Sequence, residues 1–218
     1  MRQRTAGFRL RVTARALVPL GLVLAAGGIG YFFVNYQGIT VSGGAMEPTY
    51  RMGERLVAER VGAGGIRRGD VVLVRVPGRY GDLPVLQRVI GTGGDHVVSD
   101  GDRVTVNGKP VAEPYVRRDA MPPALDPYDV RVPDGRLFLL GDNRGNANDS
   151  RFFLDERSGS VEASGVLGRV RKDFTAPAAT LALGALGGVL TLTGFGLWIA
   201  GYAAGRSAAT RPVVTGRW

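Results

Sequence analysis

Residues Val85–Val111 read VLQRVIGTGGDHVVSDGDRVTVNGKPV, and this stretch decides the fold class. Short β-branched runs alternate within it with Asp100-Gly101 and Asn107-Gly108, two dipeptides that favour the tight turns of β-hairpins. The pattern predicts a mainly β domain. Similar apolar runs recur on both sides of the stretch, at Arg55–Ala58, Val71–Val76, Arg136–Leu140 and Val166–Val170.

The segment Tyr115–Asp134 differs from the rest of this domain. It contains Pro122, Pro123, Pro127 and Pro133, and its apolar residues show little periodicity. Proline clusters favour turns and loops, so we expect an irregular excursion here rather than a further strand or a separate domain.

Two long charge-free runs flank the β-rich segment. The stretches 17–36 and 175–205 are each long enough to cross a hydrocarbon core of roughly 30 Å as a helix. We therefore predict a basic N-terminus at 1–15, transmembrane helices at 16–36 and 175–201, an external domain at 37–173 and a tail at 202–218. An alternative for the first run is a removable signal peptide, because it follows a basic segment and contains Ala25-Ala26.

The charges are unevenly distributed along the chain. Of 218 residues, 28 are basic and 19 acidic, and every acidic residue lies between Glu47 and Asp173. The only charged residues near either end of the chain are arginines. The positive-inside rule therefore places both termini in the cytoplasm and the central domain on the extracytoplasmic face of the cell (plasma) membrane. The first expected partner of this multi-pass protein is the membrane lipid bilayer. The central segment is nearly neutral, which argues against nucleic acid as a partner.

The composition also limits the chemistry. The chain has no Cys and a single His, His96, so a disulfide framework, a thiolate nucleophile and a Cys-ligated or His-based metal site are not expected.

Four segments in order carry a family resemblance. They are Ser42–Tyr50 (SGGAMEPTY), Arg68–Val74 (RGDVVLV), Gln87–Val97 (QRVIGTGGDHV) and Gly141–Arg151 (GDNRGNANDSR). In this order and behind an apolar span, they resemble the type I signal peptidases (leader peptidases) of the S26 peptidase family. The resemblance implies a β-rich domain flanked by membrane helices that cleaves signal peptides from exported proteins after small residues, with a serine nucleophile, a neutral lysine base and no cofactor.

The resemblance places the catalytic positions on residues that cannot perform this chemistry. The family's serine falls on Ala45, its lysine on Gln87, and a hydroxyl that orients the lysine on Ala147. A methyl group cannot attack a carbonyl, and a carboxamide cannot accept a proton near neutral pH. Loss of the nucleophile in another serine protease lowers turnover about 10⁶-fold, or roughly 8 kcal/mol. A naturally inactive homologue is the simplest interpretation.

Other polar residues are candidates to replace the missing serine and lysine. In an extended chain Ser42 would lie about 10 Å from Ala45 and face the opposite side. Thr49 is expected to stabilise its turn. The two lysines, Lys109 and Lys172, are expected to face solvent or lipid head groups. One branch of the family has a histidine in place of the lysine, at the position of Gln87. His96 lies nine residues further on, so it does not match that histidine.

Further parts of the family's site are retained. Gly43 and the N–H of Ala45 match the oxyanion hole, and Met46 matches a residue beside the pocket for small side chains. Asp149 and Arg151 are expected to form a buried or half-buried ion pair. The structural frame that the resemblance implies consists of Arg88, Asp142, Asn143, Arg144, Asp149, Ser150 and Arg151.

Three functions remain open at this point. The first is a non-catalytic homologue whose groove binds signal peptides in extended form, since addition beside a strand edge needs main-chain hydrogen bonds and no nucleophile. The second is an active signal peptidase that uses an unrecognised catalytic group. The third is a regulatory or structural partner of an active peptidase or of the export channel.

Overall fold

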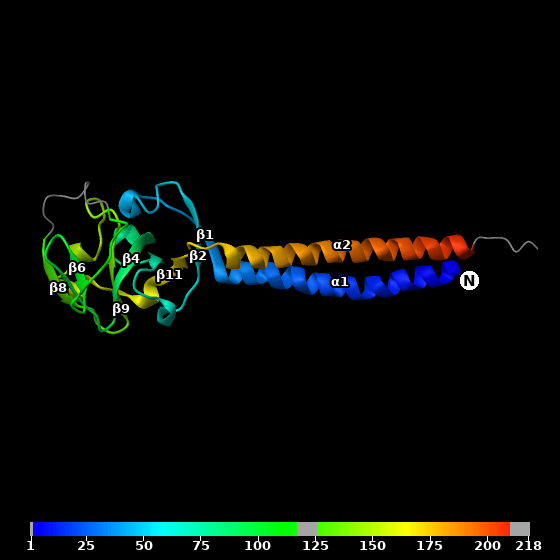
Figure 1. Cartoon of the computed structure of the whole chain (residues 1–218), viewed down its shortest axis with the longest axis horizontal. Coiled ribbons are helices and arrows are strands. Elements are labelled where there is room, and N and C mark those ends of the chain that lie inside the picture. The colour runs from blue at the N-terminus through cyan, green and yellow to red at the C-terminus, as the bar shows by residue number, and fades with distance from the viewer. Residues whose placement is uncertain (1, 117–125, 210–218) are drawn as a thin grey trace, which may run out of the picture. The chain divides into compact units, whose positions relative to one another are not determined.

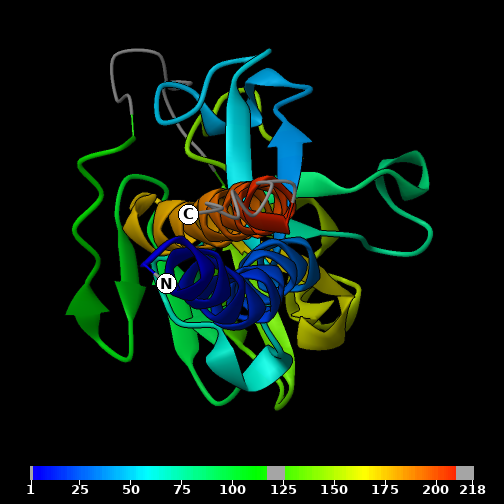
Figure 2. The same cartoon turned by 90° about the vertical axis from the view of Figure 1, so that its right-hand side faces the viewer.

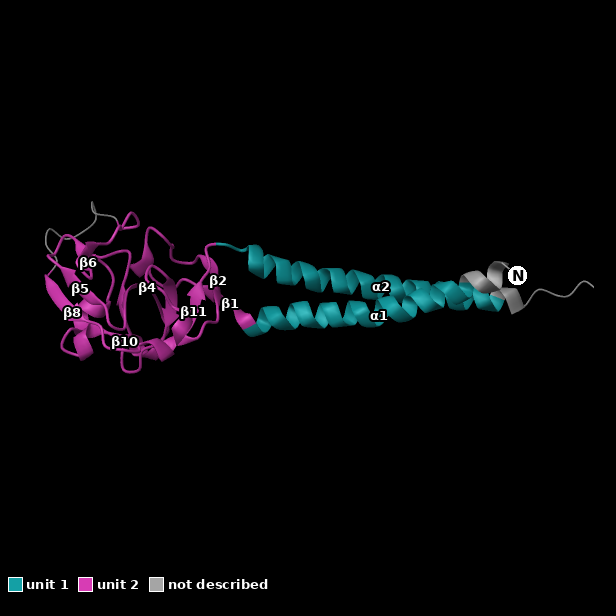
Figure 3. Cartoon of the chain, turned by 60° about the horizontal axis from the view of Figure 1, so that its bottom comes forward, with its two compact units in different colours: residues 1–34, 173–218 teal, residues 35–172 magenta. Residues whose placement is uncertain are grey.

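The computed structural model describes residues 2–116 and 126–209, which form two compact units (Figure 3). One unit combines Met1–Val34 with Asp173–Trp218, and the other is Asn35–Lys172. The first contains two long helices, and the second contains the strands.

The main sheet of the β unit has seven strands, and all of its pairings are antiparallel. Its spatial order is β1-β2-β11-β3-β4-β9-β10. Side chains alternate between buried and less buried along β11, as expected for a sheet with one face against a core. The strands are β1 (Tyr36–Thr40), β2 (Arg55–Glu59), β3 (Val71–Val74), β4 (Val85–Thr92), β9 (Arg136–Leu140), β10 (Val161–Glu162) and β11 (Val166–Val170).

A second sheet has four strands in the order β7-β6-β5-β8. Asn107 and Gly108 both have positive φ, 53° and 74°, so the predicted tight turn between β6 and β7 is present. The mainly β prediction is thus confirmed. The strands are β5 (His96–Ser99), β6 (Val104–Val106), β7 (Lys109–Pro110) and β8 (Tyr128–Arg131).

The expectation of an entirely irregular segment at Tyr115–Asp134 is wrong, because β8 lies within it. Tyr128 and Val130 are buried, whereas Asp129 and Arg131 are exposed, and the strand pairs with β5. This alternation is too short to stand out in the sequence, and its pairing partner lies about thirty residues away in the chain. Residues 117–125 of the segment lie outside the described residues.

The hydrophobic core of the β unit forms three clusters. One contains Val72, Val89 and Leu139, and a second contains Val97 and Phe138. The third, around Met46 and Leu56, packs the loop after β1 against β2, β3 and β11. Neighbouring strands β4 and β9 supply residues to both of the first two clusters, so they position the segments at their ends.

The helical unit consists of α1 (Arg2–Asn35) and α2 (Thr175–Ala209), which run side by side in Figures 1 and 2. A side chain at Gly21 would lie 2.6 Å from the carbonyl oxygen of Gly187, and one at Gly28 would lie 2.7 Å from that of Thr180. The two backbones therefore approach closely through small residues, as in membrane helix pairs.

Both helices contain candidate membrane spans. These are Gly7–Asn35, with a mean hydropathy of 2.1, and Thr175–Arg206, with a mean hydropathy of 1.7. The helix α1 begins before the predicted span 16–36 and ends at Asn35, whereas α2 continues past the predicted span 175–201. Arg and Ala favour the helix, so they do not end it where the apolar run ends.

Truncation of a core leucine tests the central sheet. Leu139 is fully buried, so we expect Leu139→Ala to lower the free energy of unfolding by about 2–5 kcal/mol. Leu83 is 68% exposed, so the same change there should alter it by less than about 0.5 kcal/mol. Urea unfolding of both full-length variants in detergent measures the difference, and equal losses would contradict the assigned core.

Candidate functional site

The segment Ser42–Tyr50, which contains the predicted nucleophile position, includes a short 3-10 helix, Gly44–Met46, after β1. The Asn143 N–H donates to the carbonyl oxygen of Ala45 at 3.0 Å, and the Asn143 side chain donates to that of Gly44 at 3.1 Å. Met46 is fully buried below them. The Gly141–Arg151 loop therefore holds this short helix by hydrogen bonds to the carbonyl groups of Gly44 and Ala45.

Gly141 permits the close approach of two of the predicted site residues. A Cβ atom on Gly141 would lie 2.3 Å from the Cβ of Ala147 and 2.7 Å from the carbonyl oxygen of Ala45. Ala147 itself is buried. The residues at the predicted nucleophile and orienting-hydroxyl positions thus both lie close to this glycine.

Gln87 is anchored to the same loop from β4. Its side chain is 2% exposed, and its Nε2 donates to the carbonyl oxygen of Asn148 at 2.8 Å and to the Tyr80 hydroxyl at 3.4 Å. Both amide protons have acceptors, so this buried polar group is satisfied. The structure therefore brings Ala45, Gln87 and Ala147 to a common loop, and their side chains offer no base and no nucleophile.

Tyr80 is a polar neighbour of Gln87 that sequence reasoning missed. It has a φ of 58° in the turn between β3 and β4, and its ring makes an edge-on contact with Phe153, with 6.1 Å between the ring centroids. Burial raises the pKa of the Tyr80 hydroxyl, so it stays protonated near neutral pH and is a weak nucleophile and base. No motif around Tyr80 indicates its place at the site.

A buried ion pair lies beside this cluster. The Arg88 Nε donates to Asp142 Oδ1 at 2.7 Å, and another guanidinium nitrogen donates to the Gly69 carbonyl oxygen at 2.9 Å. The side chains of Arg88 and Asp142 are 3% and 1% exposed. Thr49 donates its hydroxyl proton to the same Asp142 carboxylate, so it connects the segment after Ala45 to this ion pair.

Arg144 forms a second buried ion pair, with Glu113. Arg144 belongs to the predicted structural frame, whereas no motif in the sequence indicates Glu113. Tyr115 packs beside the pair, with the Arg88 guanidinium 3.9 Å from its ring centroid, and burial raises the pKa of Tyr115 to about 12. Arg88 and Arg144 are thus both held by carboxylates from other segments.

Asp149 and Arg151 form the buried pair that the sequence predicted. The Arg151 Nε donates to Asp149 Oδ1 at 2.8 Å, and the other Asp149 oxygen accepts from the Gly141 N–H at 3.0 Å. The Ser150 hydroxyl accepts from the Leu139 N–H at 3.0 Å. These contacts attach the loop to the end of β9, so a structural role is sufficient to explain all three residues.

A small cavity of about 100 Å³ opens beside Ala45. Gly43 is extended, with a φ of −150°, and a Cβ atom on it would meet open space. Ser42 and Ala45 both line this cavity. The cavity is lined by Ile39, Thr40, Val41, Ser42, Gly43, Ala45, Met46, Leu73, Pro84, Val85 and Leu86.

The remaining candidates for a base lie in other parts of the β unit. Lys109 is exposed on β7, and Lys172 is exposed after β11. His96 is on β5, where its Nε2 lies 2.5 Å from Asp129 Oδ1. The four-stranded sheet therefore holds the histidine and one lysine, whereas Gln87 belongs to the seven-stranded sheet.

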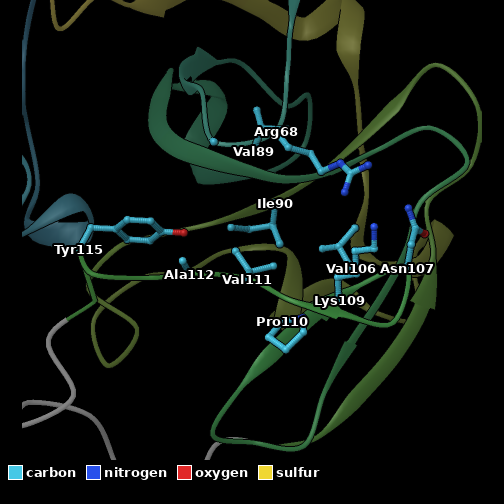
Figure 4. Close-up of a pocket in the computed structure, with 11 residues that line it drawn as sticks. Arg68, Val89, Ile90, Val106, Asn107, Lys109, Pro110, Val111, Ala112 and Tyr115 are labelled. Atoms are coloured by element: carbon cyan, nitrogen blue, oxygen red, sulfur yellow. The ribbon is translucent and has the colours of Figure 1, made fainter.

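A larger cavity of about 420 Å³ lies between β4 and the β6–β7 hairpin (Figure 4). Its apolar wall includes Ile90 and Val111, and the Tyr115 hydroxyl points into it. Arg68 and Lys109 lie toward the other end. Neither Ala45 nor Gln87 lines this cavity, so it is separate from the cluster that the resemblance identifies.

Comparison with known proteins adds a relationship over most of the chain. A family model described as "Signal peptidase, peptidase S26" matches residues 11–174, a range that contains all four resembling segments. Signal peptidase I U of Bacillus subtilis (strain 168) is 28% identical over 160 residues, which are 69% of this chain and 84% of that protein. Signal peptidase I of Bacillus licheniformis is 35% identical over 143 residues, 62% of this chain and 74% of that protein. A crystal structure of a signal peptidase I from Enterococcus faecalis V583 matches with a TM-score of 0.40 and 26% identity, over 49% of this chain and 97% of that chain.

Removal of the charge from Asp142 tests the buried ion pair. Asp142→Asn leaves Arg88 buried without a counter-charge, so we expect it to lower the free energy of unfolding by about 3–5 kcal/mol. Asp102→Asn removes a carboxylate from an exposed pair with Arg103 and should change it by less than about 1 kcal/mol. Chemical denaturation compares the two variants, and similar stabilities would refute the importance of the pair.

Proposed function

Because this chain belongs to the signal peptidase family, peptidase S26, we propose that it is a membrane-anchored, non-catalytic homologue that binds signal peptides of exported proteins without cleaving them. The observation that supports this most strongly is the convergence of Ala45, Gln87 and Ala147 on the Gly141–Arg151 loop. An alkyl side chain, a hydrogen-bonded carboxamide and a second alkyl side chain stand where acyl transfer needs a nucleophile, a base and an orienting hydroxyl.

The surroundings of Gln87 support the absence of a base, because they suit a neutral side chain at this position. A lysine in this position would bury its amine and would need a depressed pKa to act as a base. Gln87 instead satisfies its two donors on Asn148 and Tyr80, which a neutral amide does without the desolvation cost of a charge. The buried site is therefore stable in an inert form.

Peptide binding is supported by the cavity beside Ala45. Open space next to Gly43 and an apolar lining that includes Leu73 and Leu86 suit an extended segment with small side chains. Backbone N–H groups at Gly43 and Ala45 would donate to its carbonyl groups, a mode of binding that needs no nucleophile.

The two apolar helices would provide the membrane anchor. Arginines without acidic neighbours occur at the N-terminal end of α1 and the C-terminal end of α2, and these are the ends that we assign to the cytoplasmic side. The β unit would then face the extracytoplasmic side, where exported proteins emerge.

One observation favours a second function, an active peptidase with a different nucleophile. Ser42 carries a hydroxyl and lines the same cavity as Ala45. Against this, Lys109 and His96 belong to the four-stranded sheet. Burial raises the pKa of the Tyr80 hydroxyl, so this group stays protonated near neutral pH and cannot accept a proton. Ser42 is therefore the residue on which a cleavage test must focus.

Incubation with a preprotein separates these two functions. We expect the full-length protein in detergent to release no signal peptide, because no general base accompanies the hydroxyl at Ser42. Signal peptidase I U of Bacillus subtilis, assayed in parallel, shows that the substrate can be cleaved. Release that disappears in Ser42→Ala would establish the active alternative and overturn the non-catalytic proposal.

A photo-crosslinkable signal peptide tests binding directly. We expect labelling of the β unit by the peptide, and at least a tenfold weaker apparent affinity in Gly43→Leu, because the leucine would occupy the open space beside Ala45. Gly62→Leu is the matched control, since a Cβ atom there also meets open space and Gly62 does not line the cavity. Labelling that is absent, or that is equal in both variants, would favour a regulatory or structural partner of an active peptidase or the export channel.

A further inference from the structure

The helical unit contains a cavity of about 320 Å³ that the proposed peptide site does not use. It lies where Pro19 interrupts the regular hydrogen bonding of α1, since proline has no N–H to donate to the carbonyl of Arg15. Its walls are apolar apart from one arginine. The lining residues are Ala14, Arg15, Val18, Pro19, Phe195 and Trp198.

The charge around this cavity is positive, and no acidic residue lines the cavity. Arg11 and Arg15 are one turn apart on α1, a spacing at which like charges are unfavourable. The Arg11 Nε donates to the Gly7 carbonyl oxygen at 3.2 Å, which neutralises no charge. Asp173 is the sole acidic residue in the sequence of this unit, and about 37 Å of helix separates it from Trp198.

The position along the helix matches the level of lipid phosphates. About 30 Å of helix separates Arg15 from Asn35, which is close to the thickness of a hydrocarbon core. Trp198 is half exposed and stacks with Phe195 and Tyr202, with centroid distances of 5.9 and 6.2 Å. Aromatic side chains of this kind favour the membrane interface. The cavity therefore has a cationic residue, Arg15, at the level of the lipid head groups and an apolar wall beside it.

We propose that this cavity binds one anionic phospholipid. The phosphate would lie against the guanidinium of Arg15 with Arg11 nearby, and an acyl chain would follow Val18 and the ring of Trp198. Basic pockets between membrane helices bind anionic head groups in this way. The inference rests on the membrane anchor in the proposed function, but not on peptide binding.

Quenching of tryptophan fluorescence by brominated lipids tests the site. The chain has two tryptophans, so Trp218→Phe leaves Trp198 as the single reporter. This full-length protein is reconstituted into vesicles that contain either brominated phosphatidylglycerol or brominated phosphatidylcholine at equal mole fraction. We expect about a fivefold preference for the anionic lipid at Trp198.

Two variants separate a site from general surface charge. Arg15→Gln should reduce the preference nearly to one, and Arg15→Lys should retain part of it. Arg9→Gln is the matched control, because Arg9 is exposed on the same helix and does not line the cavity. Equal effects of Arg9→Gln and Arg15→Gln would overturn the inference.

The remaining outcomes distinguish this inference from the membrane anchor. Equal quenching by the two lipids would refute the lipid site and leave the anchor intact. No quenching by either lipid would show that Trp198 is outside the bilayer, which would overturn both. Addition of inorganic phosphate should leave the preference unchanged, and its loss would show that the site recognises free phosphate and not a lipid.

Discussion

The buried ion pair between Arg88 and Asp142 is the contact on which the rest of the β unit depends. Charges removed from water are unfavourable unless they are paired and hydrogen-bonded, so neither residue can move without the other. Arg88 belongs to β4, Asp142 follows β9, and Thr49 adds its hydroxyl from the segment after Ala45. One pair therefore couples two central strands to the loops around the candidate site.

This coupling explains how the loops around the candidate site are held in place independently of any catalytic chemistry. The groups that hold the loops, including Asp149 and Arg151, are satisfied by contacts within the fold and need no catalytic partner. Ala45, Ala147 and Gln87 are satisfied as well, two by packing and one by hydrogen bonds. Stability and turnover thus depend on different side chains, and the second set can change while the first is retained.

The helical unit is packed through small residues along its length. Close contacts at Gly21 and Gly28 need small residues and carry no charge, so they serve the packing of α1 against α2. Similar contacts continue beside the arginines, because a Cβ atom on Gly201 would lie 3.0 Å from the carbonyl oxygen of Gly7 and 3.0 Å from a side-chain carbon of Arg11. Close packing and positive charge therefore occur in the same part of this helix pair.

The sequence by itself determined what depends on local pattern: the β-rich domain, the tight turn at Asn107-Gly108, the two apolar helices and the inert residue types at positions 45, 87 and 147. Side-chain chemistry belongs to single residues, and propensity and periodicity belong to short runs of neighbouring residues. The features that depend on them can therefore be deduced from the sequence alone. Only the tertiary structure decided that β8 pairs with β5, that Tyr80 and Glu113 join the buried polar groups, and that Ser42 shares a cavity with Ala45. Each of these facts depends on how the segments fold against one another, and this is set by the packing of the whole core.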